Sequence, residues 1–191
     1  MLPSDKINFE KIQFLVVDSN HHSLNLTTAV VAGFGAHNIL KCTTVAEARD
    51  IVCGHPIDFL LISAQMADED GYAFVRWLRR KAPEVNRFIP VIALSSHTRR
   101  SQVLAARDCG VQGVIAKPLV PKVLIERAFW VAHDDRRYIV CEGYVGPDRR
   151  LQNLGPPQGI EGRREEDMQA AAEASDIEAE HEAAKQIEAA R

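Results

Sequence analysis

The sequence has few cysteines, and their arrangement excludes the sites that cysteine usually builds. Zinc sites need closely spaced cysteine or histidine pairs, and disulfide-rich folds need a dense framework of cysteines. Here no C-x-x-C spacing occurs, and the four cysteines are scattered through apolar contexts: Cys42, Cys53, Cys109 and Cys141. We therefore expect buried free thiols in a reducing compartment, without a disulfide or a zinc ion.

Long apolar runs are also missing. No segment approaches the roughly 20 apolar residues of a membrane span, and the start MLPSDKINFEK has no apolar run behind a basic segment. We therefore expect a cytoplasmic protein without a membrane partner. The formal net charge of −3 also gives no reason to expect a nucleic-acid partner.

The short motifs that mark common enzyme sites are absent as well. The sequence contains no glycine-rich phosphate-binding loop, no paired nucleophile and base, and no cluster of metal ligands. We therefore expect no catalytic activity, no cofactor and no bound metal. An enzyme is the least favoured of the functional hypotheses.

What the sequence does contain is an alternation of short apolar runs and amphipathic segments. The apolar runs are typical of strands buried on both faces of a sheet: residues 12–18, 38–43, 58–63, 90–95 and 113–118. Segments with helical spacing of apolar residues follow them: residues 23–35, 45–54, 72–82, 99–110 and 122–133. This pattern predicts an α/β fold with a doubly wound five-stranded parallel sheet in the flavodoxin-like order 2-1-3-4-5.

The segment over residues 72–82 is predicted to be an amphipathic helix. Phe74, Trp77 and Leu78 are expected to face the core. The arginines of this segment are expected to face mostly outward: Arg76, Arg79 and Arg80.

Composition divides the chain into four predicted segments. Residues 1–10 precede the α/β domain of residues 11–133, an extension or linker covers 134–160, and an Ala/Glu-rich charged helix covers 161–191. The last segment has a net charge of −6 against +3 for the rest. The extension is too apolar for a simple linker, so we expect it to dock on a partner or back on the domain: Tyr138, Ile139, Val140, Tyr144 and Val145.

Polar side chains end four of the predicted strands. Asp18, Ser63, Ser95 and Lys117 end strands 1, 3, 4 and 5. In an open parallel sheet the ligand site lies beyond the carboxyl ends of the strands, where the strand order reverses. These residues are therefore the candidate site.

Four motifs at these strand ends together resemble a bacterial response-regulator receiver domain of the CheY type. They are FLVVD ending at Asp18, the dipeptide Asp70-Gly71, PVIALSS over residues 90–96 and GVIAKP over residues 113–118. The resemblance covers residues 11–133, nearly two-thirds of the chain.

The resemblance implies a phosphorylation pocket. In the family, the residue at the position of Ser63 is an aspartate that accepts phosphate from a histidine kinase, and a pair of acids after strand 1 binds magnesium with it. The hydroxyl at Ser95 and the amine at Lys117 would contact the phosphoryl group. The resemblance also implies a cis peptide bond at Lys117-Pro118.

Three departures imply that this pocket is degenerate. Ser63 replaces the phosphoacceptor aspartate, Ser19 replaces the second acid, and Val114 stands where many members carry an aromatic switch residue. A serine hydroxyl cannot form an acyl phosphate, and a single carboxylate is a poor magnesium site. We therefore expect Asp18 to pair with Lys117, and Ser63 to hydrogen-bond to Lys117, Ser95 or water.

The favoured hypothesis is a stand-alone pseudo-receiver in two-component, or phosphorelay, signal transduction. It would bind a signalling protein, independently of phosphorylation, on the face of residues 99–133, and it could also self-associate. The alternative is a receptor for a small ligand or a cyclic dinucleotide. Such a receptor would use the degenerate pocket or an anion site of paired arginines: Arg99, Arg100, Arg149 and Arg150.

Overall fold

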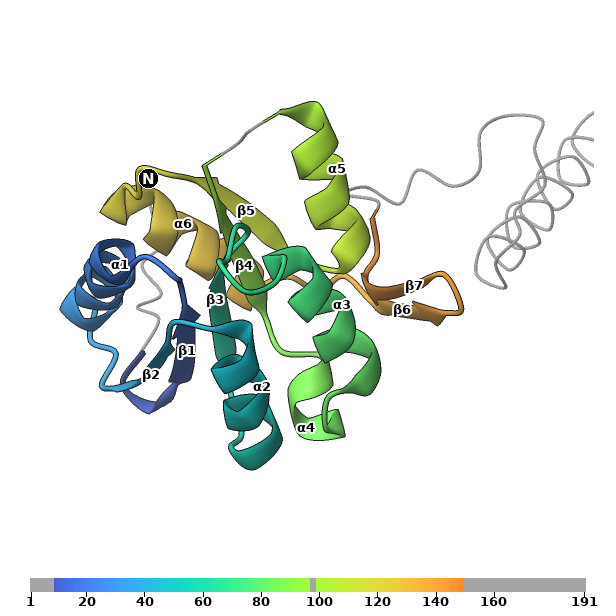
Figure 1. Cartoon of the computed structure of the whole chain (residues 1–191), viewed down its shortest axis with the longest axis horizontal. Coiled ribbons are helices and arrows are strands. Elements are labelled where there is room, and N and C mark those ends of the chain that lie inside the picture. Colours follow the sequence, from blue (N-terminus) through green and yellow to red (C-terminus); the bar gives the residue numbers. More distant parts are fainter. Residues whose placement is uncertain (1–8, 97–98, 150–191) are drawn as a thin grey trace, which may run out of the picture. The chain divides into compact units, whose positions relative to one another are not determined.

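The computed structural model describes residues 9–96 and 99–149, and a five-stranded parallel sheet lies at the centre of this part. The strands run in the order β2-β1-β3-β4-β5 (Figure 1), which confirms the predicted fold. Their bounds are β1 Gln13–Val17, β2 Asn38–Cys42, β3 Phe59–Ser63, β4 Val91–Ser95 and β5 Gly113–Ala116.

Helices precede and connect the strands, and two short ones, at Phe9–Lys11 and Glu84–Arg87, were not predicted. The helices are η1 Phe9–Lys11, α1 His21–Gly33, α2 Val45–Gly54, α3 Gly71–Lys81, α4 Glu84–Arg87, α5 Arg100–Cys109 and α6 Pro121–Ala132. The helices predicted over residues 99–110 and 122–133 are therefore α5 and α6. Within the described ranges, no helix is long and apolar enough to cross a membrane.

The unpredicted helix α4 is held by tertiary contacts. Asn86 is fully buried, and its side-chain amide donates to the backbone oxygens of Val52 and His55 at 2.7 Å. Its carbonyl oxygen accepts from the backbone nitrogen of Ile57 at 2.8 Å. One turn of helix has little intrinsic stability, so these contacts with the α2–β3 loop explain why it forms.

Helices cover both faces of the sheet, and each face has its own hydrophobic core. Along β1, Leu15 packs with α2, α3 and α5, while Phe14 and Val16 pack with α1 and α6. The same alternation occurs along β3, because successive side chains of a strand point to opposite faces. Both faces of the central strands are therefore covered, as the continuous apolar runs predicted.

Beyond α6 the chain forms a β-hairpin that packs back on the domain. Its antiparallel strands are β6 Tyr138–Cys141 and β7 Tyr144–Pro147, and β7 contacts α3 and α5 (Figure 1). The backbones of Gly110 and Gly146 lie close together. A Cβ atom added to Gly146 would lie only 2.7 Å from the Gly110 Cα, so a side chain there would collide with it. The compact unit consequently extends to Arg149. The predicted linker residues 150–160 and the predicted helix of residues 161–191 lie outside the described residues.

Arg79 on α3 is buried, which corrects the prediction that it faces outward. It is 1% exposed, and burial lowers the pKa of its guanidinium. The Tyr138 ring of the hairpin lies 5.3 Å from the guanidinium carbon. The guanidinium donates to four oxygens: those of Gly110 (3.1 Å), Arg87 (2.7 Å), Ile89 (2.8 Å) and the Gln112 side chain (3.0 Å).

The cysteines divide into two pairs. Cys42 and Cys109 are buried, and burial raises the pKa of both thiols to about 12. Cys53 and Cys141 are exposed free thiols, so the prediction that they are buried was wrong. Cys53 lies near the end of α2 and Cys141 ends β6, and both side chains point away from the cores.

Candidate functional site

The four predicted strand-end residues meet at the carboxyl edge of the sheet. Ser63 and Ser95 are the last residues of β3 and β4, and Asp18 and Lys117 directly follow β1 and β5. Asp18 and both serines are buried, while Lys117 is partly exposed. The fold therefore gathers residues that are up to 99 positions apart in sequence.

Lys117 forms the expected ion pair with Asp18. The Lys117 Nζ lies 2.6 Å from the Asp18 Oδ2, and the two side chains are 20% and 2% exposed. A buried ion pair is stable only where hydrogen bonds satisfy its remaining polar atoms. The Asp18 carboxylate also accepts from the Asn20 backbone nitrogen at 3.0 Å and from the Ser23 Oγ at 2.6 Å, so it is well satisfied.

Asn20 and Ser23 belong to the site, and the sequence did not single them out. Asn20 is the N-cap of α1, and its side chain accepts from the Ser23 backbone nitrogen at 3.0 Å. An asparagine just before a helix is a recognised capping signal. That signal locates the start of α1, but only the folded chain shows that this helix end is built around Asp18.

Ser63 is held between two partners. Its hydroxyl accepts from the Lys117 Nζ at 3.0 Å, as expected, and donates to the Gln65 backbone oxygen at 3.0 Å. The lysine therefore bridges Asp18 and Ser63. The Ser63 hydroxyl therefore has both a donor and an acceptor, and Ser63 is only 3% exposed.

Ser95 and Tyr72 form the part of the edge that lies towards α3. Both are buried, and the Ser95 backbone oxygen accepts from the Lys117 backbone nitrogen at 2.8 Å. Burial raises the pKa of the Tyr72 hydroxyl, and the nearby Ser95 side chain partly offsets this. Tyr72 could not be singled out from the sequence, because a tyrosine on the apolar face of a helix is typical of any core.

Three further predicted positions lie around this edge. The Lys117–Pro118 peptide bond is cis, as the resemblance implies. Ser19 is half-buried directly after Asp18. Val114 is half-buried on β5 and packs with the core under α2, α3 and α5. Their roles in signalling stay predictions.

The acidic turn after β3 is used for structure and adds no carboxylate to the pocket. Asp68 accepts from the backbone nitrogen of Val45 at 2.7 Å at the start of α2. Asp70 is the N-cap of α3. Glu69 pairs with Arg49 at 2.9 Å. Carboxylates at helix N-termini are favourable because the helix dipole is positive there.

The paired arginines are not gathered into one site. Arg99 and Arg100 are exposed at the start of α5, whereas Arg149 reaches Asp108 in the last turn of α5, at 3.5 Å. Arg100 and Asp108 are eight positions apart in this helix, which corresponds to about 12 Å along its axis. Arg150 lies outside the described residues.

The residues at the edge do not fit a magnesium ion. Magnesium prefers an octahedron of oxygen ligands that includes carboxylates, and here the single carboxylate is occupied by the Lys117 ammonium. Among residues 9–96 and 99–149, no three His, Cys, Asp or Glu side chains are grouped as a metal site would require. No step of the proposed function therefore involves a metal.

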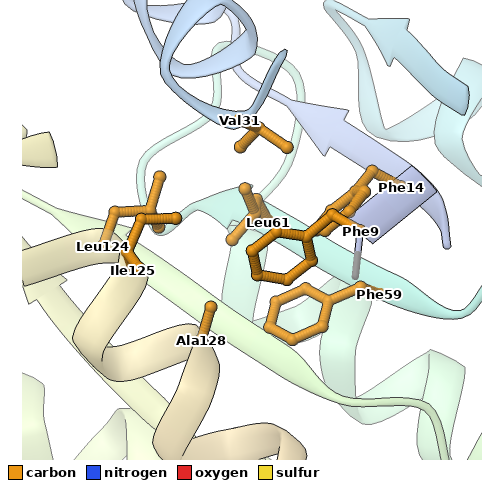
Figure 2. Close-up of a pocket in the computed structure, with 8 residues that line it drawn as sticks. All are labelled: Phe9, Phe14, Val31, Phe59, Leu61, Leu124, Ile125 and Ala128. Carbon is orange, nitrogen blue, oxygen red and sulfur yellow. The ribbon is translucent and has the colours of Figure 1, made fainter. Parts of the chain in front are cut away.

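A small hollow lies on the face of the sheet that α1 and α6 cover, and its lining is purely apolar. Figure 2 shows its lining of Phe9, Phe14, Val31, Phe59, Leu61, Leu124, Ile125 and Ala128. Its volume of about 10 Å³ is too small for anything beyond a water molecule, and no polar group lines it to hold one. It is a small packing defect under α1 and α6.

Comparison with known families matches this geometry to one of them. The family described as the response regulator receiver domain matches residues 14–129, more than half of the chain. The chain belongs to this family. The matched range runs from β1 into α6, so it includes all five strands of the sheet and every residue of the edge described above.

Relatives of this receiver come from bacterial signalling. The polar-differentiation response regulator DivK of Brucella ovis is 26% identical over 111 residues, which cover 58% of this chain and 88% of DivK. The response regulator PleD of Caulobacter vibrioides is 27% identical over 113 residues, which cover 59% of this chain. That match spans only 24% of PleD, so about a quarter of that protein is compared.

Solved structures show the same fold. The chemotaxis response regulator CheY4 of Vibrio cholerae superimposes with a TM-score of 0.58 at 19% identity, covering 63% of this chain and 98% of CheY4. At this identity the likeness concerns the fold alone. The receiver family nevertheless places this chain among the modules of two-component systems, which interact with signalling partners.

Proposed function

We propose that this receiver does not accept phosphate and acts in two-component signalling as a phosphorylation-independent interaction module. One observation carries the proposal: the Lys117 Nζ lies 2.6 Å from the Asp18 Oδ2 and 3.0 Å from the Ser63 Oγ. The positions that the resemblance assigns to phosphate chemistry are therefore bonded to one another. We call the two contacts of Lys117, with Asp18 and with Ser63, the lock.

The chemistry of Ser63 supports this proposal. A carboxylate can attack phosphorus directly and form an acyl phosphate, whereas a serine hydroxyl needs a base that removes its proton. The Asp18 carboxylate shares the Lys117 ammonium with Ser63, and its oxygens already accept from Lys117, Asn20 and Ser23. The Ser63 hydroxyl itself donates to the Gln65 backbone oxygen. It is therefore neither activated nor presented to a phosphodonor.

The lock also holds one conformation of the receiver. Lys117 directly follows β5, so its ion pair ties the β5–α6 loop to the start of α1. At the other end of the domain, Arg79 binds the Gly110 backbone oxygen and so holds the end of α5 against α3. We propose that the face of α5, β5 and α6 is thereby kept ready for a partner without phosphorylation.

The exposed surface of this face supports a protein partner. Val103, Leu104, Val120 and Val123 are between 38% and 50% exposed on α5 and around the start of α6. Apolar side chains gathered on a surface mark binding sites more often than scattered ones do. The ligand-receptor alternative lacks comparable support. Arg99 and Arg100 lie at one end of α5 and Arg149 at the other, and in the pocket the Lys117 ammonium already binds Asp18.

The test is the response to a phosphate mimic. We expect beryllofluoride with saturating Mg²⁺ to leave the amide NMR spectrum unchanged. The Ser19→Asp/Ser63→Asp variant, which restores the missing carboxylates, is the positive control. A saturable spectral change of the natural sequence at low millimolar Mg²⁺ would contradict the proposal.

A further inference from the structure

The hydrogen-bond pattern of the hairpin shows which backbone groups point away from it. In an antiparallel pair, opposite residues alternate between those that bond to each other and those whose N–H and C=O groups point outward. The Asp148 nitrogen donates to the Arg137 oxygen at 2.8 Å, so residues 137, 139 and 141 bond inward, towards β7. The backbone groups of Tyr138 and Val140 therefore point to the outer side of β6.

The two outer sides of the hairpin differ in what lies next to them. On the β7 side the Val145 oxygen faces the end of α5, because a Cβ atom added to Gly110 would lie 2.6 Å from it. On the β6 side, no turn or loop within residues 9–96 and 99–149 forms a backbone hydrogen bond with Val140. The hairpin lies at the margin of the domain (Figure 1). We call the outward backbone groups of Tyr138 and Val140 the open edge.

The open edge lacks the features that usually keep edge strands from pairing. Proteins protect such strands with a charged side chain, a proline or a bulge. The strand β6 has the sequence YIVC, without a charge or a proline, and it pairs with β7 in continuous register. Val140 is 68% exposed, the highest value among the exposed large apolar side chains of the described residues. An apolar and unprotected edge indicates a surface that another strand covers.

The strand that carries the open edge is already held in place by the domain. The Tyr138 ring lies 5.3 Å from the Arg79 guanidinium carbon and 5.2 Å from the centre of the Phe88 ring. At the loop of the hairpin, the Arg80 side chain donates to the Glu142 backbone oxygen at 3.1 Å. A strand fixed in this way loses little conformational entropy when another strand binds to it.

We infer that the open edge pairs with the open edge of a second copy of this chain, so that two hairpins form one antiparallel sheet. The same patch then lies on both subunits about a two-fold axis. The hairpin is outside the pocket and outside the face of α5, β5 and α6. The inference therefore goes beyond the proposed function and does not depend on it.

The direction of the backbone groups also determines the register. Only Tyr138 and Val140 present N–H and C=O groups on the outer side of β6, so each Val140 faces the Tyr138 of the second copy. Each such pair exchanges two hydrogen bonds, and the two-fold axis passes beside Ile139. A register in which Val140 faces Val140 would leave the Tyr138 groups of both strands without a partner in β6.

Side chains in and around β6 favour a second copy in antiparallel orientation. Arg136 and Arg137 precede the strand and Glu142 follows it. Antiparallel pairing brings the acidic end of each strand to the basic end of the other, whereas parallel pairing would bring like charges together. The register also places the exposed Val140 beside the Tyr138 ring of the second copy. Pairs of an aromatic and a β-branched residue stabilise sheets.

The first test measures the oligomeric state of the whole chain by sedimentation equilibrium, over protein concentrations up to the millimolar range. We expect a concentration-dependent dimer without any phosphodonor. Val140→Lys places a charge on the open edge and should weaken dimerisation at least about tenfold. Val140→Pro removes an N–H group that the hairpin itself does not use, so it should also weaken dimerisation. The control is Val120→Lys, at a residue 50% exposed before α6, which should change nothing.

The second test checks the register by cross-linking. In a background that lacks the two exposed thiols, Cys53→Ser/Cys141→Ser, we add Ile139→Cys. Opposite residues of a non-hydrogen-bonded pair have Cα atoms about 4.5 Å apart, which is within the reach of a disulfide. Mild oxidation should therefore yield a covalent dimer. Val140→Cys in the same background should not cross-link, because the two positions are about 7 Å apart along the strands alone.

Three outcomes would overturn the inference. They are a monomer at every concentration, a dimer that Val120→Lys dissociates while Val140→Lys leaves it intact, and equal cross-linking of Ile139→Cys and Val140→Cys. Val140→Lys changes an exposed side chain, so melting curves that match the natural sequence will separate lost pairing from lost folding. A response of the natural sequence to beryllofluoride would count against the proposed function alone.

Discussion

The two ends of this receiver each bury a charged side chain, and they stabilise it in different ways. At the carboxyl edge of the sheet, the Asp18 side chain is 2% exposed and is paired with the Lys117 ammonium. At the opposite end, Arg79 is 1% exposed and is surrounded by three backbone oxygens and one side-chain amide oxygen. None of these four hydrogen-bond acceptors is a carboxylate.

The difference shows at which end of the domain a single substitution can remove the partner of the buried charge. An ion pair between two side chains can be released by replacing or neutralising either partner. Backbone oxygens cannot be removed by mutation, so three of the four contacts in the Arg79 cage depend on the positions of Arg87, Ile89 and Gly110, and one depends on the Gln112 side chain. We call the end with the Asp18–Lys117 pair the pocket end and the end with Arg79 the hairpin end. We infer that substitutions can alter the contacts of the pocket end, whereas the hairpin end is held in one arrangement.

The largest expected effect comes from emptying the Arg79 cage. Arg79→Leu leaves three backbone oxygens and Gln112 without their donor, at about 1–3 kcal/mol for each buried unsatisfied group. We expect a loss of roughly 3–5 kcal/mol in the free energy of unfolding, measured by urea denaturation. Arg80→Leu, on the neighbouring exposed arginine, should stay within about 0.5 kcal/mol. Equal stabilities for the two variants would show that the cage contributes nothing.

The pocket end should lose less when its pair is broken. Lys117→Met leaves the Asp18 carboxylate buried with two weaker donors. We expect a loss of roughly 2–3 kcal/mol, since Lys117 is partly exposed and water can reach the gap. Asp18→Asn keeps an acceptor for Asn20 and Ser23 and should cost only about 1 kcal/mol. Urea denaturation checks both, and the reverse order would mean that the lysine is the more costly charge to isolate.

Restoring the carboxylates should make the pocket end respond to metal. In Ser19→Asp/Ser63→Asp three carboxylates lie together, and their repulsion should lower stability in EDTA by roughly 1–2 kcal/mol. Magnesium at about tenfold its dissociation constant should return about 1.4 kcal/mol. The check is the melting temperature in EDTA and in Mg²⁺. Identical melting curves would mean that the inferred pocket geometry is wrong.

The smallest expected effect is a difference in the rate of chemical labelling between the exposed and the buried thiols. The thiolate is the reactive form, and burial raises the pKa of Cys42 and Cys109 to about 12. At pH 8, iodoacetamide should therefore label Cys53 and Cys141 first, as read by peptide mass spectrometry.

The two buried thiols should then report local opening of separate ends. Cys109 ends α5 beside the hairpin, and the Cys42 backbone oxygen accepts from the Asp18 nitrogen at 3.2 Å. Arg79→Leu should speed labelling of Cys109 more than that of Cys42, because local opening differs across a structure. Equal acceleration would show that the two ends open together.

The sheet and its functional edge could be predicted because both depend on local patterns. Five apolar runs of strand length, each followed by an amphipathic segment, leave few possible topologies. Asp18, Ser63, Ser95 and Lys117 stand at strand ends, and parallel strands bring those ends together. The Asp18–Lys117 pair then followed from charge alone, and the structure contains it.

The hairpin end could not be predicted in the same way. An arginine followed by two other basic residues in the last turn of α3 looks like part of a solvated face. Nothing near it in sequence shows that four oxygens accept hydrogen bonds from it. Those oxygens come from residues 87 to 112, and the covering Tyr138 ring is contributed by the hairpin. The sequence suggested that the extension docks, but the surface on which it docks appears only in three dimensions.

The sequence by itself determined the strand order and the position of Asp18, Ser63 and Lys117 at strand ends, because the periodicity that marks strands and helices acts over short distances along the chain. Only the tertiary structure decided the burial of Arg79, the α4 turn tied by Asn86 and the seat of the hairpin on Gly110. The physical reason is that a buried polar group is stable only where its partners converge, and these partners come from elements that meet only when the chain is folded.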